Sequence, residues 1–124
     1  MESQIIRPDP DRESLTEERC SILEILNHPD LPALSLASAR VEPGVRTANH
    51  ALDFDEVYYV LSGEGVMYFD GEQAGAVTAG DSVVIRRGVA QCIENTGSED
   101  LVFLCICNPR FVETGYQARE ETWR

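Results

Sequence analysis

Residues 44–63 read GVRTANHALDFDEVYYVLSG, and this stretch decides the fold class. Two short runs, 45–52 and 56–62, contain the β-forming residues Val, Thr, Tyr and Leu and flank a polar segment at residues 53–55. Short runs of this kind, separated by turn residues, are typical of antiparallel strands. The stretch therefore predicts two neighbouring strands joined by a tight connection.

The same alternation of short β-rich runs and turn residues continues along the chain from residue 33. Asp70-Gly71 lies between two such runs and is a hairpin signal, because the favoured two-residue turn requires positive φ. This spacing predicts an all-β sandwich or barrel. The expected strands are 34–42, 45–52, 56–62, 65–70, 73–77, 82–86, 90–95 and 101–107.

The two ends of the sequence are less regular. Residues 1–13 are polar and contain Pro, so a loosely ordered segment is expected there. Residues 14–17 (SLTE) have the pattern of a capping box and favour a short helical turn. Residues 20–27 fit a helix or a strand, and a strand is favoured because the following runs are all β. After Asn108-Pro109, which ends the last strand, a short strand or a helix would fit.

A second stretch, residues 80–95 (GDSVVIRRGVAQCIEN), completes a pair of motifs. The first stretch resembles the cupin motif G-x5-H-x-H-x3-E-x6-G, and the second is similar to G-x5-P-x-G-x2-H-x3-N. The matching positions, where glycine and Asn suit sharp turns, are Gly44, His50, Glu56, Gly63, Gly80, Gly88 and Asn95. The resemblance implies one cupin domain over residues 14–124, an antiparallel double-stranded β-helix of the jelly-roll type.

The resemblance also implies a metal centre, since metal-bearing cupins hold one ion with two His and a Glu from the first motif and a His from the second. Leu52 and Gln91 stand at two of these four positions. The remaining donors, His50, Glu56 and Gln91, form a set suited to Fe, Mn, Ni or Zn. The alternative is a metal-free barrel in which these groups hydrogen-bond with one another and with water.

Strand periodicity brings further side chains to this site, because residues two apart on a strand share a face. Arg46 would share a face with His50 and is a candidate for holding a substrate carboxylate, or else a solvated charge. Tyr58 would share a face with Glu56 and is a candidate hydrogen-bond or proton donor, or else plain barrel lining.

Four cysteines are present, and none forms a CxxC pair, so reduced thiols are expected. Cys105 and Cys107 share a face of the last expected strand. We interpret them as small apolar core residues, and a CxC zinc or redox site is the alternative.

The charge balance narrows the partners and cofactors. Asp and Glu number 22 against 10 basic residues, for a net charge of −12, so nucleic acid and membrane surfaces are poor partners. Every basic residue is Arg, which argues against pyridoxal phosphate held by a lysine and against a P-loop. The sequence also lacks a glycine-rich dinucleotide loop, so no nucleotide or flavin is expected.

The sequence thus predicts a small cupin that binds a divalent metal and acts on a small organic molecule. The resemblance implies dioxygenase, decarboxylase, lyase or isomerase chemistry, and a non-catalytic, metal-free binding or sensing cupin is the alternative. The start, MESQIIRPDPDRES, lacks the basic and apolar segments of a signal peptide, so a cytoplasmic location is expected. A homodimer is expected, because short cupins pair through edge strands and the apolar run at residues 20–26 would be buried by pairing with a second copy.

Overall fold

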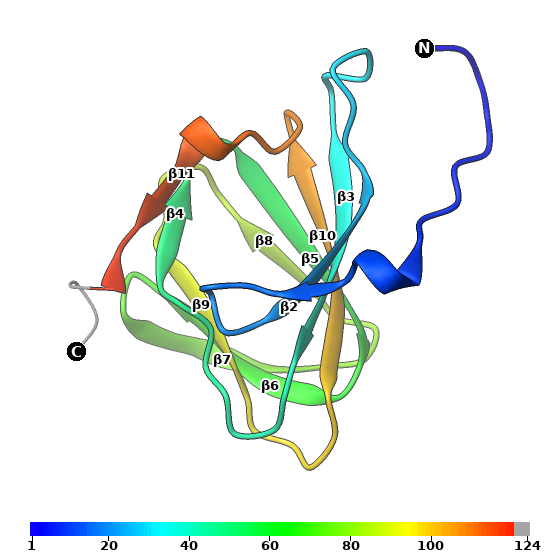
Figure 1. Ribbon diagram of the computed structural model, residues 1–124. Coiled ribbons are helices and arrows are strands. Elements are labelled where there is room, and N and C mark those ends of the chain that lie inside the picture. The colour runs from blue at the N-terminus through cyan, green and yellow to red at the C-terminus, as the bar shows by residue number, and fades with distance from the viewer. Residues whose placement is uncertain (121–124) are drawn as a thin grey trace.

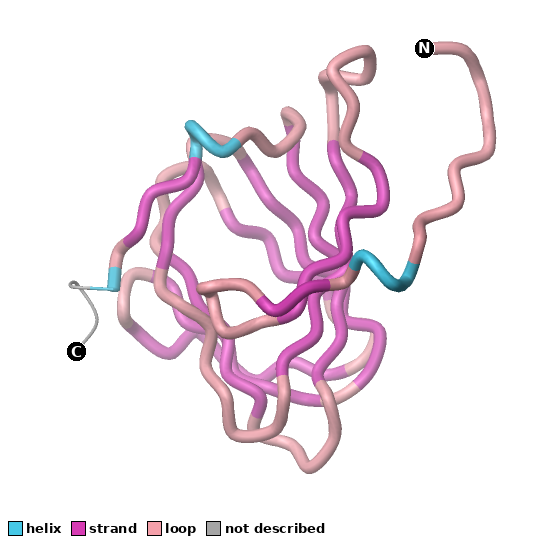
Figure 2. Tube along the Cα trace, in the orientation of Figure 1, coloured by secondary structure: helices cyan, strands magenta, loops and turns pink. Residues whose placement is uncertain are grey.

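Two antiparallel sheets face each other in the computed structural model, which describes residues 1–120 (Figures 1 and 2). The larger sheet has the strand order β1-β2-β3-β10-β5-β8, and the smaller has the order β11-β4-β9-β6-β7. The larger sheet contains β1 (Ser14–Leu15), β2 (Ser21–Leu26), β3 (Ser35–Val41), β10 (Leu101–Asn108), β5 (Asp55–Ser62) and β8 (Ser82–Ile85). The smaller sheet contains β11 (Tyr116–Ala118), β4 (His50–Leu52), β9 (Gln91–Asn95), β6 (Glu64–Phe69) and β7 (Glu72–Thr78).

From β3 onward the chain crosses repeatedly from one sheet to the other, so most strands pair with partners that are distant in sequence. This wrapping gives the double-stranded β-helix and confirms the predicted all-β jelly roll. Two 3-10 turns, η1 (Pro10–Arg12) and η2 (Glu113–Gly115), are the helical elements of residues 1–120. Among these residues no helix is long and apolar enough to cross a membrane.

The turns that were predicted because they need a residue with positive φ are present. Asp70 has φ 51° and Gly71 has φ 81°, as a two-residue hairpin with the strand-matching twist requires. The four motif glycines at positions 44, 63, 80 and 88 also have positive φ. Asn95 differs, because it ends β9 and is buried. Its amide nitrogen donates to the backbone oxygens of Val41 and Glu99, and its Oδ1 accepts from the N–H of Gly97, so its side chain closes the expected turn after β9 without a positive φ.

The expected strand at 45–52 is only partly correct. Regular pairing is confined to β4, and Arg46 forms an isolated bridge to Glu94. The register shifts by one residue between this bridge and the pairing of His50 with Gln91, and in between the N–H of Ala48 donates to the backbone oxygen of Glu18, in the turn between β1 and β2. Strict alternation of faces therefore fails in this segment.

The N-terminal predictions are corrected in one place and confirmed in another. The helical turn expected at 14–17 is wrong, because Ser14 and Leu15 pair with β2 as a short strand. The Thr16 hydroxyl accepts from the N–H of Glu18 and donates to the oxygen of Cys20, which closes the turn that follows. The strand favoured at 20–27 is confirmed as β2. Since β2 pairs with β3 within the same chain, its apolar run has a partner already.

Residues 1–13 carry η1 and are almost all exposed, and the expected domain boundary at residue 13 stays a prediction. At the other end, both expected alternatives occur, as η2 followed by β11. The last part of that expectation, residues 121–124, lies outside the described residues.

The apolar core fills one end of the barrel, which we call the packed end. Its fully buried side chains come from both sheets. Those from β3, β5 and β10 lie toward one end of each of these strands. The fully buried side chains are Val41, Val60, Met67, Ile93, Leu101 and Phe103. The opposite ends of the same strands face a cavity, and this is the open end of the barrel.

Candidate functional site

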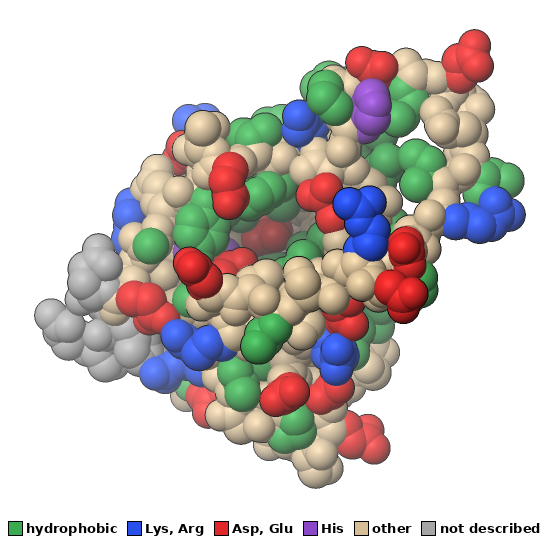
Figure 3. Space-filling view, viewed as in Figure 1, with side chains coloured by type: hydrophobic (Ala, Val, Ile, Leu, Met, Phe, Trp, Pro, Cys, Tyr) green, Lys and Arg blue, Asp and Glu red, His purple; other side chains and the backbone are tan. Residues whose placement is uncertain are grey.

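A cavity of about 530 Å³ opens between the two sheets at the open end. Its walls come from β2, β3, β4, β5 and β10, from the turn before β2, and from η2 and β11. Figure 3 shows the hollow, with acidic side chains gathered around and inside it. The volume falls within the range of small-molecule sites in proteins.

A chain of hydrogen bonds crosses from one sheet to the other at the floor of this cavity. The Tyr58 hydroxyl donates to Oε1 of Gln91 over 2.6 Å, and Nε2 of Gln91 donates to Oε1 of Glu56 over 2.8 Å. Tyr58 and Glu56 lie two apart on β5, so the period of the strand turns both inward. All three side chains are buried, with exposed fractions of 5% or less for Tyr58 and Gln91 and 7% for Glu56.

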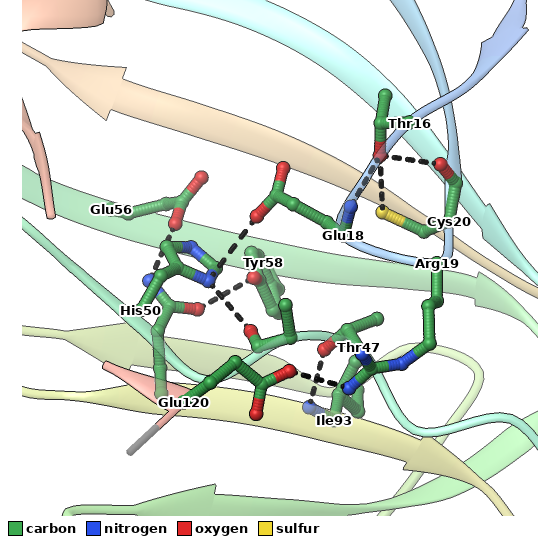
Figure 4. A network of polar contacts seen from close by, with 12 residues as sticks. Thr16, Glu18, Arg19, Cys20, Thr47, His50, Glu56, Tyr58, Ile93 and Glu120 are labelled. Carbon is green, nitrogen blue, oxygen red and sulfur yellow. Dashed lines mark hydrogen bonds and ion pairs between the residues drawn. The ribbon is translucent and has the colours of Figure 1, made fainter. Parts of the chain in front are cut away.

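His50 lies beside this chain, since β4 and β9 pair His50 directly with Gln91. Its Nδ1 is 3.0 Å from the backbone oxygen of Ala48 and 3.2 Å from a carboxylate oxygen of Glu18 (Figure 4). Both neighbours are hydrogen-bond acceptors, so Nδ1 carries a ring proton, and in the neutral ring the lone pair is on Nε2. The ring also stacks on Tyr116, with ring centroids 5.0 Å apart and planes at 15°. His50 is thereby held in one orientation as a proton acceptor.

Sequence reasoning missed Glu18 and Tyr116. Glu18 belongs to the turn before β2, and Tyr116 to the short strand β11 that pairs with β4. Both are distant in sequence from the two motifs, and no local pattern links them to His50. Only the pairing of the chain ends with β3 and β4 brings them to the cavity wall.

Burial disfavours charge at the cavity floor. It raises the pKa of Glu56, although the hydrogen bond from Gln91 and the neighbouring His50 act in the opposite direction. Burial also raises the pKa of Tyr58 well above its ordinary value, and the nearby Glu56 adds to the effect. Glu56 therefore holds its proton to higher pH than an exposed Glu does, and Tyr58 remains a donor.

Three thiols line the cavity: Cys20, Cys105 and Cys107. The Cys107 thiol donates to Oε2 of Glu56 over 3.5 Å. Burial raises the pKa of all three thiols, that of Cys20 to about 12, so they are protonated and weak nucleophiles. Cys105 and Cys107 share a face as expected, and that face forms cavity wall as well as core.

Arg46 does not join the site, and its expected place beside His50 is wrong. Its guanidinium carbon lies 5.9 Å from the ring centroid of Tyr68, and Arg46 is not part of the cavity wall. Thr47 and His50, three residues apart, face the cavity instead. The irregular backbone before β4 shifts the register by one residue, which reverses the face on which each side chain lies.

The predicted metal donors converge, yet their hydrogen bonding does not fit a metal ion. Gln91 uses its carboxamide oxygen to accept from Tyr58 and its nitrogen to donate to Glu56. Leu52 supplies no donor, and burial raises the pKa of Glu56. Within residues 1–120, no three His, Cys, Asp or Glu side chains are grouped closely enough to hold a metal.

Comparison with known proteins places the chain in a family. The sequence matches the cupin domain family over residues 37–107, more than half of the chain. The chain belongs to the cupin family. This cupin is 36% identical over 95 residues to an uncharacterised protein of Methanocaldococcus jannaschii, and the match covers 73% of the chain and 75% of that protein. It is 37% identical over 71 residues to an oxalate-binding protein of Thermotoga maritima, covering 56% of the chain and 58% of that protein.

Solved structures agree with this assignment at the level of the fold. A conserved protein with a double-stranded β-helix domain from Klebsiella pneumoniae superposes with a TM-score of 0.74 at 21% identity. The superposition covers 95% of this cupin and 99% of that chain. The barrel architecture is therefore shared by sequences that have diverged widely.

Proposed function

We propose that this cupin binds a small organic molecule in the cavity at the open end, in a site that contains no resident metal. The observation that carries the proposal is the bridging of Tyr58 and Glu56 by Gln91. A carboxamide whose oxygen and nitrogen both have protein partners, at 2.6 and 2.8 Å, acts as a structural bridge of the polar floor, because its oxygen already accepts from Tyr58 and its nitrogen already donates to Glu56. The 530 Å³ above it accommodates a ligand of ordinary metabolite size.

In this proposal His50 is the group that contacts the ligand. With Nδ1 held by Ala48 and Glu18, the lone pair on Nε2 accepts a hydrogen bond from a ligand hydroxyl or amine. Glu18 orients the ring and stabilises the imidazolium if the ligand gives up a proton. The stacked Tyr116 prevents the ring from turning away.

The sequence instead led us to expect a metal-dependent enzyme, which would contain a bound metal. In that alternative His50, Glu56 and Gln91 hold Fe, Mn, Ni or Zn, and Tyr58 orients a substrate. The oxygen of Gln91 would then have to hold the ion while it also accepts the hydrogen bond from Tyr58. The two alternatives therefore differ in metal content and in the response of the protein to added metal.

Metal analysis of the purified full chain, followed by a thermal-shift screen with small organic molecules, tests the proposal. We expect substoichiometric metal, no stabilisation by added Fe, Mn, Ni or Zn, and stabilisation by a class of small molecules. A ligand at a hundred times its Kd adds about 2.7 kcal/mol to the free energy of unfolding. Stoichiometric metal that is lost in a His50→Ala variant would instead support the metal-dependent enzyme.

The two histidines provide a matched pair of variants. His50→Gln should weaken binding of any hit from the screen by about tenfold or more, since it removes the Nε2 acceptor and the contact with Glu18. His28→Gln alters an exposed histidine outside the cavity and should leave binding unchanged. Equal binding by both variants would contradict the assignment of His50.

The expected homodimer and cytoplasmic location remain predictions of the sequence. The apolar run at residues 20–26 gives no support for a dimer, because it pairs as β2 within the chain. Edge strand β8 carries Val84 with 61% of its surface exposed, beside the exposed Tyr59 and Leu61 of β5. Light scattering of the purified protein distinguishes a dimer from a monomer.

A further inference from the structure

The charged side chains on the described part of the cavity wall all have the same sign. Five are glutamates, and no arginine lies among them. They are Glu17, Glu18, Glu24, Glu56 and Glu113. Burial favours the protonated form of Glu56, so the negative charge comes mainly from the four glutamates nearer the rim. Figure 3 shows acidic side chains at several places around the hollow.

Arginines that lie close in sequence to the cavity wall are directed elsewhere. Arg19 donates to the backbone oxygen of Arg46 and forms an ion pair with Glu120 at 2.8 Å. Arg110 donates to Oδ1 of Asn27. A carboxylate ligand would therefore enter the cavity without an arginine on the described wall to meet it, in a protein of net charge −12. Desolvation of an anion against like charges is strongly unfavourable.

The same wall suits a cation for a second, independent reason. Aromatic side chains line the cavity from both sheets and from the segment after β10: Tyr58, Phe111 and Tyr116, with Phe103 where the cavity borders the packed core. The faces of aromatic rings attract organic cations, and the attraction grows when the cation is desolvated. His50 Nε2 adds an acceptor lone pair to which an ammonium N–H donates.

We propose that this cavity selects a small organic cation, a protonated amine with an apolar body, and rejects carboxylates of the same shape. The inference rests on the proposed function, because it names the ligand class of the same cavity. It also sets this cupin apart from the oxalate-binding relative of Thermotoga maritima. A dianion such as oxalate would be repelled by the rim glutamates, because they carry the same sign of charge.

Sets of three compounds that share one skeleton and differ in charge test this selectivity. One set is phenethylamine, 2-phenylethanol and 3-phenylpropionate; a second is tryptamine, tryptophol and indole-3-propionate. Binding is measured by calorimetry at pH 7.5 on the full chain, after treatment with EDTA and with metal content checked. We expect each amine to bind about tenfold or more tightly than its matched carboxylate, with the alcohol between them. Amine binding should weaken as salt is raised, because screening reduces the attraction of the rim.

Single charge-neutralising variants locate the source of the selectivity. Glu24→Gln and Glu113→Gln, at the rim, should each weaken amine binding by about threefold and leave alcohol binding unchanged. Glu72→Gln removes the same charge from an exposed position on β7, outside the cavity wall, and should change neither. An equal effect of Glu72→Gln would mean that net charge alone is responsible, which would overturn the assignment to the cavity.

The possible failures of the two proposals can be told apart. If carboxylates bind as tightly as amines and His50→Gln abolishes that binding, the charge inference falls while the proposed function stands. If oxalate binds only after Fe or Mn is added, both the charge inference and the metal-free site are overturned. If no amine of either set binds, the charge inference is overturned, and if the wider screen also yields no ligand, the proposed function falls with it.

Discussion

The packed end and the open end of this barrel are built from the same strands, but the inward side chains form an apolar core at one end and a polar cavity at the other. On β5, Val60 is fully buried in the apolar core, whereas Tyr58 and Glu56, further along the same face, form the polar floor of the cavity. On β10, Leu101 lies in the core and Cys107 contacts Glu56. The period of the strand decides which side chains point inward, but the position along the strand decides whether they meet apolar partners or a cavity.

This difference predicts that the two ends contribute unequally to stability, and the largest contrast concerns apolar side chains. Ile93→Ala at the packed end should lower the free energy of unfolding by about 2–5 kcal/mol, because it opens a void in close-packed core. Leu36→Ala on the cavity wall should cost less than half as much, since its side chain is only half-buried and already borders open space. Urea denaturation measures both. Equal losses would mean that the open end is packed as tightly as the core.

A second contrast concerns charge at the open end and appears as a pH dependence. The folded-state pKa of Glu56 is raised above 4.5 by burial, so the folded protein holds this proton more tightly than the unfolded chain. The contribution of Glu56 to stability is therefore complete below about pH 4.5 and is lost as the pH rises through the raised pKa. Glu56→Gln stays neutral and keeps the bond from Gln91, so it should gain stability relative to the natural chain as the pH rises.

Denaturation series from pH 4 to pH 8 test this pH dependence, with Glu72→Gln as the control. Because position 72 is exposed, the Glu72→Gln variant should show the same change of unfolding free energy with pH as the natural chain. Parallel pH curves for Glu56→Gln and the natural chain would contradict a raised pKa at position 56.

The smallest contrast removes one hydroxyl from each of two tyrosines. Tyr58→Phe leaves the buried oxygen of Gln91 without its donor and should cost about 1–3 kcal/mol. Tyr68→Phe removes a hydroxyl that donates to Glu94 from a half-buried position, where water can replace it, and should cost about 1 kcal/mol or less. Thermal unfolding of both variants provides the comparison. A smaller loss for Tyr58→Phe than for Tyr68→Phe would contradict the buried polar floor.

Features of the fold that depend on local chemistry could be predicted from the sequence. Asp70-Gly71 predicted a hairpin because few residues adopt positive φ at low cost, and the turn is present. The resemblance of the two motifs to those of cupins implied that His50, Glu56 and Gln91 would meet, and they do, through pairing of β4 with β9 and the bond from Gln91 to Glu56. The helical turn at 14–17 was wrong because pairing with β2 offered the same backbone groups a partner that local propensity does not reveal.

The sequence alone determined the barrel, its order of turns and the three side chains at its centre, because alternation, glycine chemistry and motif spacing are local properties. Tertiary structure decided what those side chains do. It directed the amide of Gln91 to Tyr58 and Glu56, placed Glu18 and Tyr116 against His50, and turned Arg46 away from the cavity. These contacts join residues up to 66 positions apart, from His50 to Tyr116, and they form only because both sheets and both chain ends close around one cavity.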